Sequence, residues 1–284
     1  MMPTLRAING SAVRAMFKHN IGMLAVAALV TAVWTMSTAQ SLASLPHLEL
    51  TLAAVFVAGI IASVAGFAFS AIAGALLAHL HPEPVELVRI LLVCSITIQA
   101  YCTAKVLRNI RWSELAPYIG GGLLTVPIGI FLLTRVSSVA YARGLGLLLV
   151  IYGVYSLCKP LVIRTERNRW LDAVVGGLGG ITGGLAAFPG AFAAIWCSAR
   201  GLSKDDQRAI CQPYIFCMQI ATLLLIGQVQ DGISSLGSLW LLVPISLLSA
   251  SVGFRLFSGL SNSQFRLMLL TVLITSGSLL IFRS

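Results

Sequence analysis

The sequence predicts an all-α polytopic membrane protein that contains two inverted repeats. First, 58% of its 284 residues are hydrophobic and only 10% are charged, whereas soluble domains carry about 25% charged residues. Second, apolar stretches long enough to cross a bilayer recur along the whole chain. Third, two of these stretches are interrupted by glycine and proline. Each repeat is therefore predicted to be a broken, re-entrant helical hairpin followed by three transmembrane helices, with an extra helix at the N-terminus.

Apolar runs define the expected membrane segments and leave no space between them for a soluble domain. In order, they are Met23–Met36, Thr51–His79, Val85–Leu107, Leu115–Thr134, Ala140–Cys158, Trp170–Ala199, Ala209–Val229, Leu236–Phe254 and Phe265–Phe282. The chain accordingly divides into an N-terminal region (1–50), a first repeat (51–158), a basic cytoplasmic linker (159–169) and a second repeat (170–284).

The N-terminal region combines a basic tail, a short apolar run and the small polar sequence Ser37-Thr38-Ala39-Gln40. This order is typical of a secretory signal peptide, and it equally suits a short transmembrane helix. We favour the uncleaved helix, because a polytopic inner-membrane protein needs no cleavable signal.

The second interrupted segment contains GGLGGITGGLAAFPGAF at residues 176–192. Glycine and proline are poor residues for a helix interior, and broken backbone in a membrane is tolerated only where protein buries it or where it lines a watery cavity. We therefore expect two arms of about fourteen residues that turn back near mid-membrane, about 21 Å deep. The spacing of Gly176, Gly180 and Gly184 also suits close helix packing, but packing gains nothing from Pro189.

A shift of the sequence by 120 residues brings similar residues of the two halves into register, which indicates a tandem duplication. The stretch 66–70 (GFAFS) falls opposite 186–190 (AAFPG), so we expect the first segment to break there. The matched pairs are Gly59 with Gly179, Ile61 with Ile181, Ala71 with Ala191, Ala73 with Ala193, Gln99 with Gln219 and Arg135 with Arg255.

The distribution of lysine and arginine predicts the topology. If both interrupted segments cross the membrane as continuous helices, each side receives eight basic residues outside the N-terminal tail. If both are hairpins, fifteen basic residues lie on one side and four on the other, as the positive-inside rule favours. A hairpin plus three crossings is an odd number, so the two halves are inverted, which is a recurring transporter plan.

The two breaks predict a binding site for an anion. A helix that begins in mid-membrane presents unpaired N–H groups and the positive end of its dipole, and proline suits such a start because it lacks an N–H group. Glycine lets a ligand approach the backbone, and serine adds a hydroxyl. Two such helix ends hold an anion without any charged side chain. The residues that we expect to bind substrate at the breaks are Gly66, Phe67, Ser70, Gly183, Gly184, Pro189 and Gly190.

Polar residues in the next spans are candidates for the wall of this site. Gln99 and Gln219 occupy matched positions, each about midway along its span. The residues within one or two turns of them are Ser95, Thr97, Gln212 and Tyr214. An intramembrane glutamine either binds a ligand or simply bonds a neighbouring helix, and both alternatives stay open. From this group we expect Thr97, Gln99, Gln212 and Gln219 to bind substrate.

Other functions are disfavoured. The net charge is +10, but the basic residues lie in short loops and form no domain that could hold nucleic acid. The sequence has no C-x-x-C, H-x-x-x-H or G-x-S-x-G motif, so we expect no enzyme, no metal site and no cofactor. All nine acids lie near span ends or in loops, which argues against cation transport and weakly against a carboxylate proton relay. An anion exporter fits, because an inside-negative potential drives anions out.

Three stretches carry a family resemblance: AGIIASVAGFAFSAIAGALL (58–77), VCSITIQAY (93–101) and GGITGGLAAFPGAFAAIWCSARGLSKDDQRAICQPYIFCMQ (179–219). With them the chain resembles the TauE/SafE sulfite exporter family of bacterial anion carriers, over about residues 51–282. The resemblance implies export of small sulfur-containing or carboxylated anions across the plasma membrane. The glycine-rich breaks of that family are carried here by Gly59, Gly66, Gly179, Gly183, Pro189 and Gly190.

The first break departs from the family pattern. Where the family often has a run of glycines, this chain has Phe67-Ala68-Phe69-Ser70, which is bulkier and more apolar. This departure favours a substrate with an organic portion.

We therefore expect a multi-pass protein of the bacterial inner membrane that exports small anions, such as sulfite, an organosulfonate or a short carboxylate, by alternating access. Its expected partners are the anionic substrate and the lipid bilayer, and a homodimer stays open. A passive anion channel shares every feature of the carrier. The third alternative is a membrane scaffold or assembly protein without transport, although a scaffold needs no duplicated, proline-broken hairpins.

Overall fold

The computed structural model describes residues 48–65, 68–78, 80–81, 83–157, 168–229, 239–256, 274, 277–278 and 281. These residues all belong to one unit, Leu45–Ser284. The expected N-terminal helix (Met23–Met36), most of the basic linker (159–169) and most of the last span (Phe265–Phe282) lie outside the described residues.

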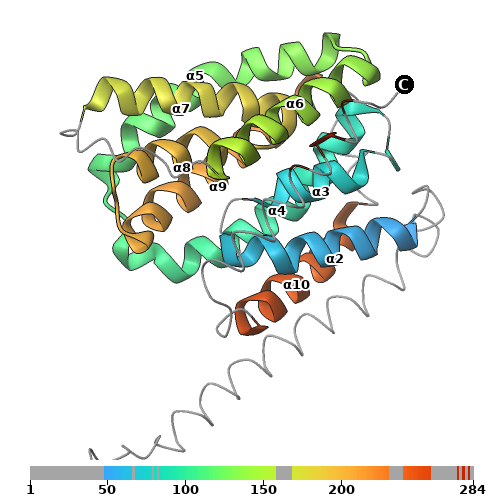
Figure 1. Ribbon diagram of the computed structural model, residues 1–284, viewed down its shortest axis with the longest axis horizontal. Helices are drawn as coiled ribbons and strands as arrows, with labels where there is room; N and C mark the ends of the chain where they lie inside the picture. Colours follow the sequence, from blue (N-terminus) through green and yellow to red (C-terminus); the bar gives the residue numbers. More distant parts are fainter. Residues whose placement is uncertain are drawn as a thin grey trace, which may run out of the picture. The chain divides into compact units, whose positions relative to one another are not determined.

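The described part of the chain is helical and contains no strand (Figure 1). Its elements are α2 (Leu48–Ala65), α3 (Phe69–Leu77), α4 (Pro84–Val106), the 3₁₀ helix η1 (Leu107–Asn109), α5 (Trp112–Arg135), α6 (Ser138–Leu157), α7 (Arg169–Ala186), α8 (Gly190–Ala199), α9 (Lys204–Val229), η3 (Leu239–Leu241) and α10 (Leu242–Leu256). Helices long and apolar enough to cross a membrane are α4 continued by η1, α5 and α9. The predicted all-helical membrane protein is thus confirmed.

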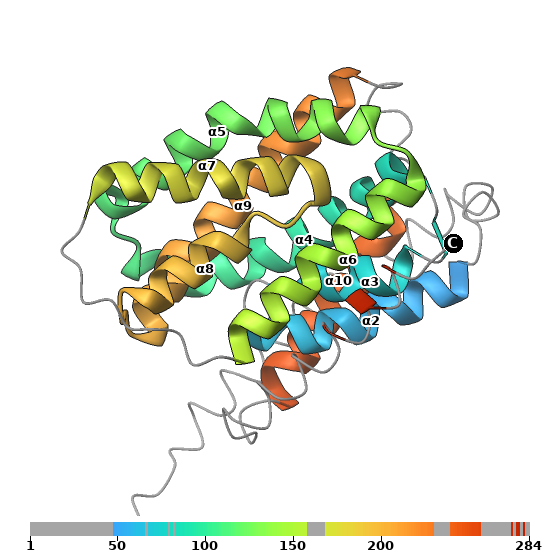
Figure 2. The same ribbon diagram turned by 45° about the horizontal axis from the view of Figure 1, so that its top comes forward.

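Both interrupted segments are broken into two helices that pack against each other. We call α2 with α3 hairpin 1, and α7 with α8 hairpin 2. Figure 2 shows the chain leaving α7, turning and returning as α8. The arms are unequal, unlike the expectation of two arms of equal length: α2 and α7 have 18 residues each, whereas α3 has 9 and α8 has 10. The first arm of each hairpin is the longer one because the break lies past the middle of the apolar segment, after Ala65 in hairpin 1 and after Ala186 in hairpin 2.

The start of α7 illustrates how the sequence sets a helix boundary. Asn168 is the N-cap, and its side-chain oxygen accepts hydrogen bonds from the backbone N–H groups of Trp170 (2.9 Å) and Leu171 (3.3 Å). Asparagine is among the best N-cap residues because it satisfies the first N–H groups of the helix. The helix therefore begins at Arg169, just before the apolar run.

The glycines of α7 form its contact with α5. A Cβ atom added at Gly176, Gly180 or Gly184 would lie 2.2, 2.3 or 2.5 Å from a backbone oxygen of α5. No side chain fits at such distances, and small residues of this spacing let two membrane helices approach closely. The packing interpretation of these three glycines is therefore confirmed, and it coexists with the break that follows them.

The main contacts between helices are symmetric with respect to the two halves of the chain. α5 lies along α7, and α2 lies along α10 (Figures 1 and 2). In addition, α4 packs against α9, α5 contacts α9 and α10 contacts α4. When α2, α4 and α5 are exchanged with α7, α9 and α10, each of these contacts maps onto another one or onto itself. Such a pattern is expected of a duplicated fold.

Candidate functional site

The break in hairpin 2 consists of Ala187, Phe188 and Pro189. Ala187 ends α7 in the left-handed conformation (φ 53°), which costs a non-glycine residue about 1–3 kcal/mol and is found preferentially at functional sites. Thr182 steadies the turn, because its Oγ1 donates a hydrogen bond to the carbonyl oxygen of Phe188 (2.9 Å). Pro189 occupies the N-cap position of α8, and no side chain caps this helix. The first N–H groups of α8 therefore have no partner within the helix.

Gln219 of α9 joins this break to α4. Its Nε2 donates hydrogen bonds to Oγ of Ser95 (2.7 Å) and to the carbonyl oxygen of Ala187 (3.3 Å). The side chain is 1% exposed, and its Oε1 has no hydrogen-bond partner among the described residues. A buried acceptor without a partner costs free energy, so a ligand hydroxyl or a water molecule would be stabilised there.

The break in hairpin 1 has similar features. Ser70 is the second residue of α3, and its buried Oγ has no hydrogen-bond partner in the described part of the chain. Like α8, α3 begins without a side-chain cap. Phe69 is also buried and makes this helix start apolar. The predicted site residues Gly66 and Phe67 lie outside the described residues.

The other predicted wall residues differ in their surroundings. Gln212 precedes Gln219 by two turns on α9, is buried, and has an Oε1 without a hydrogen-bond partner among the residues described. Gln99 is buried in α4. Thr97 is half-buried, and its hydroxyl donates to a carbonyl oxygen one turn earlier in its own helix (2.8 Å). The hydroxyl hydrogen of Thr97 is thus already used within α4.

The two adjacent predicted glycines have different neighbours. A Cβ atom added at Gly183 would lie 3.1 Å from the ring of Pro189, so Gly183 lies against the break that leads into Gly190. Gly184 instead faces the backbone of α5, and this packing alone explains why it has no side chain. Substrate binding by both residues stays a prediction.

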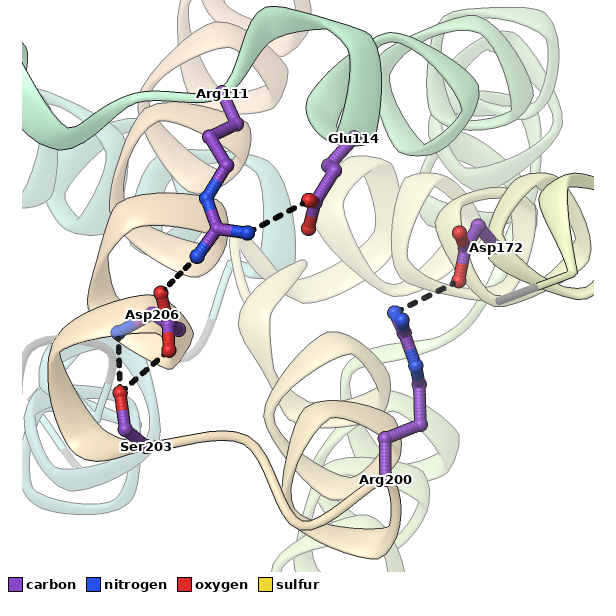
Figure 3. Close-up of polar contacts among 6 residues, drawn as sticks. All are labelled: Arg111, Glu114, Asp172, Arg200, Ser203 and Asp206. Carbon is purple, nitrogen blue, oxygen red and sulfur yellow. Dashed lines mark hydrogen bonds and ion pairs between the residues drawn. The ribbon is translucent and has the colours of Figure 1, made fainter. Parts of the chain in front are cut away.

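Asp172 is a buried charged residue whose burial the sequence did not indicate. It lies in the first turn of α7, near a span end as expected, but it is 0% exposed. Its Oδ1 accepts hydrogen bonds from the hydroxyl of Tyr118 (2.8 Å) and from Nε1 of Trp196 (2.8 Å). The same oxygen lies 3.6 Å from Nη1 of Arg200 (Figure 3). A buried carboxylate requires partners of this kind. In the sequence, the arginine that follows the short arm is the feature that could have indicated a partner for Asp172.

A second group of charges joins the start of α5 to the start of α9 (Figure 3). Arg111 forms ion pairs with Glu114 (3.0 Å) and with Asp206, and Asp206 also accepts a hydrogen bond from the Ser203 hydroxyl (2.6 Å). Glu114, and then Asp206, raise the pKa of Arg111 above its ordinary value. Because the arginine is exposed, salt screens these pairs and they add little stability. They do show which loops are neighbours.

The match to known sequences covers both hairpins and the helices after each. A family profile described as Sulfite exporter TauE/SafE matches residues 51–280. A search of curated proteins and a search of solved structures each found no significant match. The profile thus begins in the first turn of α2 and ends one residue before the last described residue. This chain belongs to the TauE/SafE sulfite exporter family.

Proposed function

We propose that the protein exports a small anion across the bacterial inner membrane by alternating access to one central site. Its family is one of membrane anion exporters rather than enzymes, and its helices include membrane-spanning ones. The proposed substrate is sulfite, an organosulfonate or a short carboxylate. The observation that carries the proposal is the uncapped start of α8 at a break that Gln219 ties to α4.

The electrostatics of this site suit an anion. The start of α8 offers N–H groups and the positive end of a helix dipole, which together favour negative charge. None of the site residues is charged, so the anion meets no permanent countercharge from which it would have to dissociate. An inside-negative potential drives export by about 2.3 kcal/mol per charge per 100 mV.

The base of each hairpin is the end at which its long arm begins and its short arm ends. Contacts at these two bases support an inverted arrangement of the hairpins. In hairpin 1, Thr51 and Glu86 both contact His81, and Glu86 lies in the first turn of α4. In hairpin 2, the start of the helix that follows α8 contacts Arg111 through Asp206, and Arg111 comes directly after the end of α4 and η1. The two bases thus lie near opposite ends of a helix that is long enough to cross the membrane. The positive-inside rule assigns the base of hairpin 2 to the cytoplasm.

The depth of the two breaks supports a shared site. Thr51 to the end of α2, and Asp172 to the end of α7, are both about fourteen helical steps, or about 21 Å. The hydrocarbon core is about 30 Å thick. Two helix starts that reach a similar depth from opposite faces satisfy the geometry of a central binding site between inverted repeats.

Aromatic residues at the breaks favour an organic substrate. Phe69 in hairpin 1 and Phe188 in hairpin 2 are both 1% exposed. Their apolar rings would contact the organic portion of a sulfonate or carboxylate, whereas bare sulfite has no such portion. We therefore rank an organosulfonate above sulfite.

The test is transport by the purified full-length chain in proteoliposomes, with radiolabelled sulfite and methanesulfonate as probes. We expect saturable counterflow, and we expect Pro189→Ala combined with Gly190→Leu to abolish it while the protein still inserts. The matched control is Gly120→Leu, because a Cβ atom there meets no atom within 4 Å. Full transport by the double variant would refute the site. Currents of single-channel size instead of counterflow would replace the carrier with a passive channel.

A further inference from the structure

The bases of the two hairpins are closed by polar residues at matching sequence positions. Each base contains a residue from the first turns of the long arm, a nitrogen-bearing side chain after the short arm, and an acid from the start of the next helix. These residues are Thr51, His81 and Glu86 in hairpin 1, and Asp172, Arg200 and Asp206 in hairpin 2. In hairpin 1 the acid of the next helix contacts the histidine, whereas in hairpin 2 Arg200 pairs with Asp172 and Asp206 pairs with Arg111. At an offset of 120 residues Glu86 falls on Asp206, and the other two pairs match to within one residue.

His81 is enclosed and held at both ring nitrogens. Its side chain is 0% exposed. Nε2 lies 2.9 Å from Oγ1 of Thr51, which is also buried, and Nδ1 lies 3.1 Å from Oε1 of Glu86. The Glu86 side chain is 40% exposed, so it connects the buried ring to solvent. The other charged residues on the elements around this base are Glu49, Glu83, Arg89, Lys105, Arg143 and Arg255.

The two bases differ in the chemistry of the nitrogen-bearing side chain. In hairpin 2 this side chain is an arginine, and arginine does not release its proton in proteins. Histidine is the side chain that ordinarily changes charge between about pH 5 and pH 8. Among the described residues of the two bases, His81 is therefore the one suited to sense pH in this range.

We propose that His81 is a proton-binding site that controls the opening of the base of hairpin 1. When the ring is neutral, Nδ1 donates to Glu86 and Nε2 accepts from the Thr51 hydroxyl. When the ring is protonated, both nitrogens donate, and the contact with Glu86 gains the attraction of opposite charges. Burial of the charged ring opposes this attraction, but Glu86 reaches solvent and keeps that cost small, so in this proposal a bound proton tightens the base and its release loosens the base.

The consequence for transport rests on the proposed function. If hairpin 1 must separate from the start of α4 during each cycle, protonation of His81 slows that step. The topology above places this base on the outer side, so the pH of the outer solution should govern it. We expect a roughly fivefold lower transport rate at about pH 6 than at about pH 8, which corresponds to about 1 kcal/mol.

The experiment uses the full-length chain in proteoliposomes and two measurements. Hydrogen exchange, corrected for the intrinsic pH dependence of amide exchange, reports opening of the start of α2 and of the turn before α4. Transport of methanesulfonate, whose charge is constant in this range, reports the rate. The variants are His81→Gln, which retains a donor and an acceptor, and Glu86→Gln, which removes the countercharge. The matched control is Glu83→Gln, an exposed acid of the same turn.

We expect stronger protection at about pH 6 than at about pH 8 in the wild type and in Glu83→Gln, and equal protection in the other two variants. Equal protection in the wild type, or a pH response that persists in His81→Gln or disappears in Glu83→Gln, would overturn the proton site. If His81→Gln does not fold, Glu86→Gln serves as the test of the proton site. This variant should fold, because the Glu86 side chain reaches the surface. If no anion is transported but the exchange pattern holds, the proposed function fails and the proton site stands.

Discussion

Removing the charge of Asp172 or of Arg200 alone should cost more stability than removing both charges together. Asp172 is fully buried and Arg200 is 9% exposed, so Asp172→Asn or Arg200→Gln alone leaves one charge inside the protein without its partner. We expect each single variant to lose about 3–5 kcal/mol of stability. The double variant Asp172→Asn/Arg200→Gln removes both charges and should recover much of that loss.

Thermal unfolding of the detergent-solubilised chain measures these effects. The control is Glu114→Gln, which breaks an ion pair with the exposed Arg111 and should leave the midpoint nearly unchanged. A double variant as unstable as the sum of its two singles would show that the pair is not coupled.

At the residue scale, the sequence predicts polar wall residues from their places in the spans, but it does not predict burial that depends on a contact with a distant residue. Ser70, Gln212 and Gln219 were named in advance, and each has a buried oxygen without a hydrogen-bond partner among the described residues. Their role as ligands is still a prediction. The buried Asp172 contacts Tyr118 of α5, and no local pattern in α7 indicates that contact.

At the scale of one element, two glycines of α7 should respond oppositely to the same substitution. A Cβ atom at Gly180 would lie 2.3 Å from a backbone oxygen of α5, whereas one at Gly177 would lie 3.4 Å from the Thr125 methyl group. We expect Gly180→Ala to destabilise the protein by roughly 1–3 kcal/mol, because the α5 backbone has to shift. Gly177→Ala should stabilise it by up to about 1 kcal/mol through helix propensity. Unfolding midpoints that shift in the same direction would contradict the observed α5–α7 contact.

The position of the break was predictable, but the extent of α7 was not. Pro189 marks where a helix must restart, since proline cannot continue a helix from within. By propensity alone, however, the run Gly176–Gly184 should already have interrupted the helix. Instead α7 continues to Ala186, because the glycines fit against α5 and this tertiary contact outweighs propensity. The terminating left-handed residue is an alanine, which no sequence rule would have selected.

At the scale of the whole molecule, the charge count and the structure agree on which loops are neighbours. The positive-inside rule favours two hairpins over two continuous helices. In the structure Arg111 contacts Asp206, so the loop before α5 and the loop before α9 lie at the same end of the bundle. Continuous helices would have placed these loops on opposite sides of the membrane. The packing pairs α5–α7 and α2–α10 could not be predicted from the sequence, since they join helices that are far apart in the chain.

Cysteine labelling from outside intact bacterial cells tests this topology. Arg108→Cys, Ser203→Cys and Glu83→Cys each place a thiol at an exposed position, in the loop before α5, the loop before α9 and the turn before α4. With a membrane-impermeant maleimide, we expect Glu83→Cys to be labelled in intact cells, and the other two only after the membrane is permeabilised. The wild-type chain provides the background, because its described cysteines are buried or only half-exposed. Labelling of Ser203→Cys but not of Arg108→Cys in intact cells would place the two loops on opposite sides of the membrane. It would thereby reject the hairpin topology, and with it the central site to which both breaks are proposed to contribute.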